Sequence, residues 1–219
     1  MLINETLYKI RKESSTSVTI QQKILQVALS FSFGILLGFI IKYSDTIPSN
    51  EFMGSFWSTI SEISSRLGIW VLLATIITVY SDNPRIGAIK VFVFFTGMML
   101  IYYFYSMKLF GFFPTYYFIR WGLIALASSI GAYILWFSRG KGWIAALCSA
   151  IPISLLVTEG YPFFYIFDLT LGLDILFTFI LFLILPMNKI QRLRTFTWAI
   201  LIVFILIKSD VQSYLFGGL

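Results

Sequence analysis

Six charged side chains stand within or at the ends of long apolar stretches of this chain, and they are the first candidates for chemistry. They are Glu62, Arg66, Arg120, Glu159, Asp168 and Asp174. A charged side chain in lipid is energetically expensive and generally has a function there. An arginine would bind an anionic group of a ligand, a carboxylate would bind a cation, and aromatic rings would contact a flat ligand. The six residues therefore form the candidate ligand-binding site.

Aromatic residues at the ends of the same stretches allow a second interpretation of these charges. The aromatic residues are Tyr102, Tyr103, Tyr105, Tyr116, Tyr117, Trp121, Tyr161 and Tyr165. Tyrosine and tryptophan commonly form a belt at the membrane–water interface, and charged side chains near a helix end can extend to the lipid headgroups. Under this alternative the polar residues form an interfacial belt and no binding site.

Asp174 is the residue that an interfacial belt explains least well. Its carboxylate is short, and its chain neighbours are Leu173 and Ile175. A buried pair between Asp174 and Arg120 would neutralise both charges, and we state this pair as a hypothesis. Replacement of Asp174 by Asn or Leu without loss of expression or folding would argue against such a pair.

The chain has no histidine and a single cysteine, Cys148, which excludes most catalytic and metal centres. A Ser-His-Asp triad, a Cys-His dyad, His-ligated zinc or haem and an intramolecular disulfide cannot form. An aspartyl intramembrane protease needs a Gly-x-Gly-Asp type motif, and Leu171-Gly172-Leu173-Asp174 has the wrong spacing. The sequence therefore predicts a protein that is not an enzyme and has no cofactor. Metal binding by carboxylates alone is left open, but no such site is predicted.

The composition is that of a membrane protein. Of 219 residues, 58% are hydrophobic and 12% are charged, and the charged fraction is about half that of a typical soluble domain. A helix needs about 20 apolar residues to cross the hydrocarbon core, and several blocks meet that length. The predicted fold is all-α, a transmembrane bundle of about seven spans at residues 24–41, 67–80, 86–107, 116–137, 143–158, 169–187 and 195–207.

Three details of this bundle are also predicted. Six spans are the alternative, because the last block is short. Pro152 predicts a bend or an interruption in the fifth span. Before the second span, apolar residues at three- and four-residue spacing predict an amphipathic helix that carries Glu62 and Arg66 as an i, i+4 pair.

Polar segments flank the transmembrane domain, which covers residues 24–208. Residues 1–23 form a basic N-terminal segment, and residues 209–219 form a short tail. A basic amphipathic helix on the inner leaflet is one interpretation of the first segment, and a solvated tail is the other. The helix would bring three apolar residues to one face, Ile3, Leu7 and Ile10.

The charge distribution predicts the orientation. With the N-terminus inside, the inner loops hold most of the 16 Lys and Arg residues, and the outer side holds most of the 10 acidic residues. This follows the positive-inside rule and predicts a multi-pass protein of the bacterial cell membrane with a cytoplasmic N-terminus. The six candidate residues would then lie on the outer side. The net charge of +6 reports topology and favours anionic lipid headgroups, so no nucleic acid is expected as a partner.

Small residues at four-residue spacing mark one face of the first span: Ser30, Gly34 and Gly38. Such a face lets two helix backbones approach closely in lipid. It predicts either a docking face for a membrane-protein partner or packing against another helix of the same chain.

The order of features resembles a family of small bacterial integral membrane proteins that is defined only as a domain of unknown function. The resemblance covers about residues 30–187 and is carried by Gly34, Gly38, Gly68-Ile69-Trp70, Tyr102-Tyr103 and Glu159-Gly160. The chain is more loosely similar to the S-components of energy-coupling-factor vitamin transporters. That similarity implies about six spans, a substrate site at the outer face and a docking role for the small residues of the first span. The seventh predicted span departs from that pattern.

These observations predict a non-catalytic membrane protein that binds a small molecule or is a component of a transporter. The alternative is a regulatory, immunity or assembly factor that binds another membrane protein. Transport predicts an outer pocket that contains Arg120 with Asp174 or Glu159. The regulatory alternative predicts tightly packed spans with these charges spread around the rim.

Overall fold

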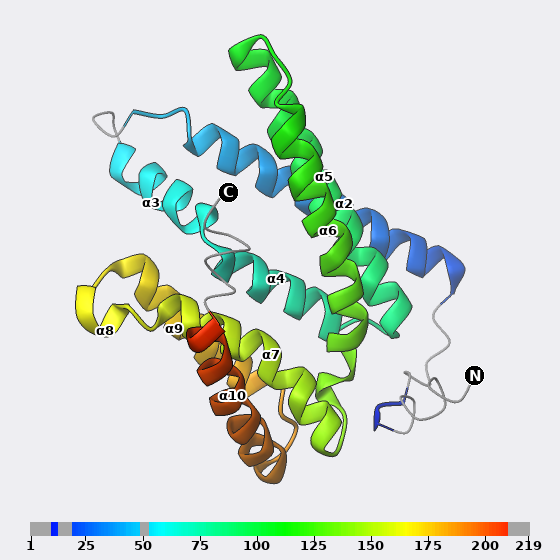
Figure 1. Ribbon diagram of the computed structural model, residues 1–219. Helices are drawn as coiled ribbons and strands as arrows, with labels where there is room; N and C mark the ends of the chain where they lie inside the picture. The colour runs from blue at the N-terminus through cyan, green and yellow to red at the C-terminus, as the bar shows by residue number, and fades with distance from the viewer. Residues whose placement is uncertain (1–9, 13–18, 49–52, 210–219) are drawn as a thin grey trace. The chain divides into compact units, whose positions relative to one another are not determined.

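The computed structural model describes residues 10–12, 19–48 and 53–209 (Figure 1). Regular structure in these residues is entirely helical, so the predicted all-α class is confirmed. The elements are α2 (Ile20–Ser44), α3 (Gly54–Ser65), α4 (Leu67–Val79), α5 (Pro84–Phe110), α6 (Thr115–Leu135), the short 3-10 helix η1 (Trp136–Arg139), α7 (Trp143–Gly160), α8 (Phe163–Ile166), α9 (Leu169–Ile184) and α10 (Lys189–Ser209). The helix predicted in the N-terminal segment lies outside the described residues, apart from Ile10; its other two apolar residues are Ile3 and Leu7. The tail beyond Ser209 also lies outside them.

Five helical segments in the described part of the chain are long and apolar enough to cross a membrane. They are Ile20–Ser44, Pro84–Phe110, Thr115–Arg139, Trp143–Ile166 and Lys189–Ser209. α3 and α4 add a sixth if they form one broken span, which bends by 69° at the break. The predicted count of about seven spans is therefore a little high, and the alternative of six is the upper limit.

α9 explains the difference in span count, whereas α10, the block whose predicted shortness allowed for six spans, is long enough to cross a membrane. α9 has 16 residues and is about 24 Å long, which is shorter than a hydrocarbon core of about 30 Å. α10 has 21 residues and begins at Lys189, earlier than the predicted start at Thr195. The polar first turn is helical because the Asn188 side chain accepts a hydrogen bond from the backbone N–H of Gln191 at 2.8 Å and caps the helix.

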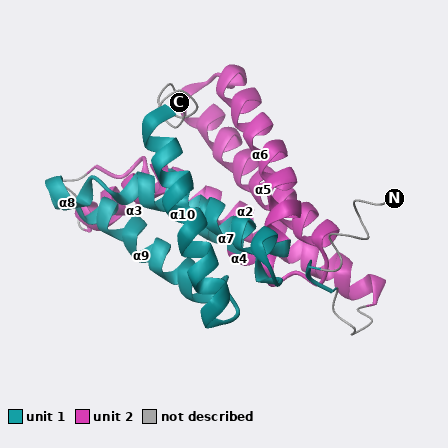
Figure 2. Ribbon diagram, turned by 60° about the horizontal axis from the view of Figure 1, so that its bottom comes forward, with its two compact units in different colours: residues 1–12, 67–75, 137–219 teal, residues 13–66, 76–136 magenta. Residues whose placement is uncertain are grey.

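The chain divides into two compact units, which Figure 2 colours separately. Unit 1 contains residues 1–12, 67–75 and 137–219, and unit 2 contains residues 13–66 and 76–136. α4 begins in unit 1 and ends in unit 2.

Unit 2 is organised by the contact between α2 and α5. A Cβ atom on Gly34 would lie 2.0 Å from the backbone oxygen of Phe94, and one on Gly38 would lie 2.4 Å from that of Met98. Gly97 of α5 packs equally closely on the backbone oxygen of Phe31, at 2.6 Å. The two backbones therefore touch at glycines, which is how small residues allow helices to pack in lipid. Packing within the chain, one of the two alternatives for Gly34 and Gly38, is what the structure describes.

Unit 1 is organised around α7, which packs against α9 and α10. The hydroxyl group of Ser154 donates to the backbone oxygen of Ala199 at 3.3 Å, and Gln191 Nε2 donates to that of Gly142 at 2.8 Å. Gly142 and Gln191 lie at the starts of α7 and α10, and Ser154 and Ala199 lie further along the same two helices. The two helices therefore run in the same direction. α9 returns the chain between them. α7 is continuous through Pro152, so of the two predicted alternatives the interruption does not occur, and the bend stays a prediction.

Candidate functional site

Asp174 of α9 is the most deeply buried carboxylate among the residues described, with 2% of its surface exposed. Two glycines from other helices of unit 1 pack against it. A Cβ atom on Gly68 of α4 would lie 1.8 Å from Asp174 Oδ1. One on Gly160 of α7 would lie 3.0 Å from the Cβ atom of Asp174 and 2.9 Å from Cδ1 of Ile175. The carboxylate thus occupies space that exists only because α4 and α7 carry glycine at these positions.

The first turn of α4 favours a negative charge at this place. α4 begins at Leu67, directly after Arg66, whose backbone is extended with φ −90° and ψ 151°. The first N–H groups of a helix have no acceptor within the helix, and the helix dipole makes this end positive. Asp174 Oδ1 lies against Gly68, the second residue of that turn. The break between α3 and α4 therefore presents a helix N-terminus to a buried carboxylate.

The other two candidate carboxylates of unit 1 lie near the same end of α7. Glu159 is half-buried and immediately precedes Gly160. Asp168 is the N-cap of α9, and its Oδ1 atom accepts hydrogen bonds from the backbone N–H groups of Thr170 at 2.8 Å and Leu171 at 3.2 Å, and also from the Thr170 hydroxyl group. Asp168 therefore has a clear structural role, because it starts the helix that holds Asp174.

The remaining three candidates belong to unit 2. Glu62 is exposed on α3, and Arg66 is half-buried at the break before α4. Arg120 Nη1 donates to the Tyr116 hydroxyl group at 3.1 Å, and its guanidinium lies 5.3 Å from the centre of the same ring. The Arg120–Asp174 pair would join the two units and stays a prediction.

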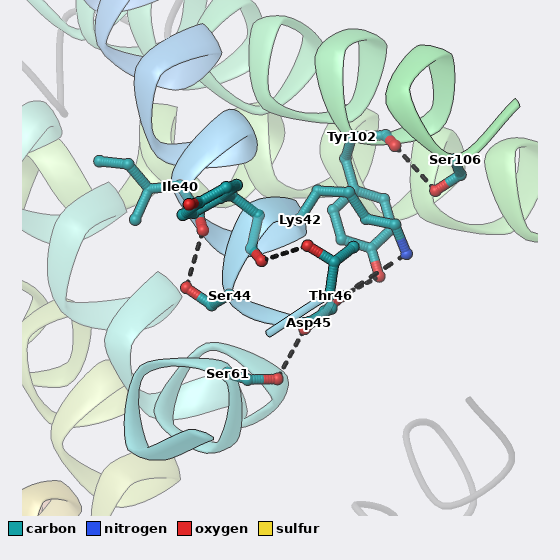
Figure 3. A network of polar contacts seen from close by, with 9 residues as sticks. Ile40, Lys42, Ser44, Asp45, Thr46, Ser61, Tyr102 and Ser106 are labelled. Atoms are coloured by element: carbon teal, nitrogen blue, oxygen red, sulfur yellow. Dashed lines mark hydrogen bonds and ion pairs between the residues drawn. The ribbon is translucent and has the colours of Figure 1, made fainter. Parts of the chain in front are cut away.

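A second polar cluster, which the sequence interpretation missed, lies in unit 2 around Asp45 (Figure 3). Asp45 Oδ1 accepts from the Ser61 hydroxyl group at 2.6 Å, and Oδ2 accepts from the Tyr102 hydroxyl group at 3.0 Å. Lys42 Nζ lies 3.7 Å from Oδ2, 4.7 Å from the centre of the Tyr102 ring and 5.3 Å from that of Phe110. Only 7% of Lys42 is exposed. The cluster fastens the C-terminal end of α2 to α3 and α5.

The signal for the Asp45 cluster was present in the sequence. Lys42 and Asp45 stand three residues apart at the end of a span, a spacing that allows an ion pair on a helix. The tyrosine that completes the cluster stands in another span. The chain alone does not say which of its tyrosines reaches Asp45, and without that partner the two charges indicate only topology.

We expect the Asp45 cluster to stabilise unit 2. Asp45→Ala leaves the buried Lys42 ammonium without its carboxylate and should lower the free energy of unfolding by about 2 kcal/mol, less than for a fully buried pair because Asp45 is partly exposed. Ser61→Ala removes one hydrogen bond to the carboxylate and should cost about 1 kcal/mol. Unfolding of the purified protein in detergent, followed by near-UV circular dichroism, measures both.

Ser58→Ala is the matched control for Ser61→Ala, since Ser58 lies on the same helix and donates only to the backbone oxygen of Ser55 in its own turn. It should change the stability by no more than about 0.5 kcal/mol. Equal effects of Ser58→Ala and Ser61→Ala would show that the hydrogen bond to Asp45 contributes nothing.

No group of three or more His, Cys, Asp or Glu side chains within residues 10–12, 19–48 and 53–209 is arranged to hold a metal ion.

Comparison with models of protein families, with curated proteins and with solved structures gives no match.

Proposed function

We propose that this protein binds or transports a small solute in the bacterial cell membrane, with its N-terminus in the cytoplasm and Asp174 as the residue that recognises the solute. The observation that carries this proposal is the burial of the Asp174 carboxylate between three apolar helices of a membrane protein. An ionisable residue within a membrane domain is expensive to bury and typically marks a ligand or ion pathway.

The broken span supports the same proposal. Transporters commonly place their binding site where a helix is interrupted, because the exposed helix end supplies partial charges within the membrane. Here α3 and α4 are separate helices with an angle of 69° between them. The first turn of α4 contacts Asp174 through Gly68. The interruption and the buried carboxylate thus occur together, as they do in that class of site.

The chemistry of the site indicates the kind of solute. A carboxylate accepts hydrogen bonds and attracts positive charge. Glu159 adds a second carboxylate close to Gly160, which itself touches Asp174. A solute with a cationic group, such as an amine, therefore fits this end of unit 1 better than an anion does.

The test is thermal unfolding of the purified protein in detergent, screened against amines, vitamins, inorganic ions and small metabolites. A ligand that binds only the folded protein at 100 times its Kd stabilises it by about 2.7 kcal/mol and raises the Tm. We expect at least one cationic compound to do so. The shift should disappear in Asp174→Asn, which keeps the size of the side chain but removes its charge.

Glu62→Gln is the control, because it removes an exposed carboxylate of the same candidate set and should leave the shift unchanged. A ligand that stabilises Asp174→Asn as much as the unmodified protein would contradict the role of Asp174. A folded protein that responds to none of the compounds would favour the alternative function, a regulatory or assembly factor that binds another membrane protein.

A further inference from the structure

One end of unit 1 collects basic residues from three separate parts of the chain. We call this the basic end, and its members are Arg11, Lys12, Arg139, Lys141, Lys189, Arg192 and Arg194. α7 and α10 both begin here, as the hydrogen bond from Gln191 Nε2 to the Gly142 oxygen shows. The Arg194 guanidinium lies 5.4 Å from the centre of the Trp143 ring, so the start of α10 also packs against the start of α7.

Ile10, directly before Arg11 in the chain, packs against the basic end. The backbone N–H of Lys141 donates to the backbone oxygen of Ile10 at 3.1 Å. A Cβ atom on Gly140 would lie 2.5 Å from Cγ2 and 2.6 Å from the backbone oxygen of Ile10. This contact brings Arg11 close to Arg139. Burial, and then the charge of Arg139, lower the pKa of Arg11 to about 10.

The acidic residues described in unit 1 lie at the other end. Glu159 and Asp174 are at the Gly160 end of α7, and Asp168 begins the helix that starts there. Since α7 has 18 residues, about 27 Å of helix separates the two groups of charges. The positive N-terminal ends of α7 and α10 point toward the basic end and add to its potential.

Exposed apolar side chains alternate with the cations at the basic end, which favours a ligand that has both an anionic and an apolar part. Trp143 and Ile144 follow Lys141, and Ile190 and Leu193 separate the cations of α10; all four are at least half exposed. A soluble anion would contact only the cations and would leave these apolar side chains uncovered. A phospholipid offers a phosphate group to the cations and acyl chains to the apolar side chains.

We propose that the basic end of unit 1 binds an anionic phospholipid, whose phosphate group lies at Arg11 and Arg139 and whose acyl chains lie along the apolar residues at the start of α7 and α10. The bound lipid would hold residues 10–12 against the turn at residues 139–142. It would also offset the repulsion between the two guanidinium groups.

The experiment titrates the full chain in neutral detergent with phosphatidylglycerol or with phosphatidylcholine of the same acyl chains, and it follows tryptophan fluorescence and the Tm. We expect phosphatidylglycerol to bind about tenfold more tightly or better. Arg11→Gln combined with Arg139→Gln should abolish this preference. Arg85→Gln combined with Lys108→Gln removes two exposed cations of unit 2 and should preserve it.

Two further arms complete the test. Inorganic phosphate and glycerol 3-phosphate should not raise the Tm at the concentrations at which the lipid does; an equal rise would replace the lipid by a soluble anion and overturn the proposal. If the Arg11 and Arg139 variant does not fold, Lys12→Gln combined with Lys141→Gln removes two exposed cations of the basic end and should weaken phosphatidylglycerol binding about threefold or more. Equal affinity for the two lipids would also overturn it, and so would an equal loss of phosphatidylglycerol binding in a basic-end double variant and in the Arg85 and Lys108 control.

Discussion

Gly68→Ala should destabilise the protein by about 3 kcal/mol, although alanine is normally favoured over glycine in a helix by about 1 kcal/mol. The added methyl group would lie 1.8 Å from Oδ1 and 2.9 Å from Cγ of Asp174. Asp174 is short and almost completely buried, so its carboxylate cannot swing into solvent to make room. Unfolding in mixed detergent micelles measures the loss.

Asp174→Ala tests whether the clash with Asp174 causes the loss of stability in Gly68→Ala. The variant that combines Gly68→Ala with Asp174→Ala should be more stable than the sum of the two single changes predicts, by about 1–3 kcal/mol, because the two residues are in contact. Gly122→Ala is the matched glycine control, since its methyl group would meet only Cε of Met99 at an ordinary 3.6 Å. Additive effects of Gly68→Ala and Asp174→Ala would contradict the packing of α4 on this carboxylate.

The same substitution at Gly34 should have an effect at least as large. Its methyl group would lie 2.0 Å from the backbone oxygen and 2.9 Å from the backbone carbon of Phe94. Backbone atoms within a helix cannot rotate away, so α2 and α5 must separate. We expect a loss of about 3 kcal/mol or more, or failure to accumulate folded protein in the membrane.

Gly131→Ala provides the comparison for Gly34→Ala, because no atom lies within 4 Å of its Cβ position. It should be neutral or stabilising by up to about 1 kcal/mol. Yield after membrane extraction and unfolding in detergent would separate the two variants. Similar stability of both would show that α2 and α5 do not pack backbone to backbone.

The sequence identified Asp174 as the charge that an interfacial belt explains least well, and it did so on local grounds. A short carboxylate between Leu173 and Ile175 in an apolar helix is costly whatever packs around it. The sequence could not identify Gly68 and Gly160 as its neighbours. They stand on other helices, and a glycine carries no side chain whose chemistry points to a partner.

Asp168 shows the opposite case. Its position before Thr170 and the apolar run of α9 is a local helix-capping pattern, and the structure uses it in this way. Its charge and its place at a span end predict a ligand-binding residue, whereas the structure gives it a capping role. The capping pattern is local and can be recognised from the sequence alone.

By itself, the sequence determined that this protein is an all-α membrane protein, because the cost of placing polar residues in lipid is summed along each helix and depends little on the neighbours. It also showed that one face of the first span consists of small residues. Only the tertiary structure decided that α5 covers that face and that Lys42, Asp45 and Tyr102 meet. Such choices depend on which helix faces come together, and within lipid many apolar faces are nearly equivalent, so packing geometry selects among them.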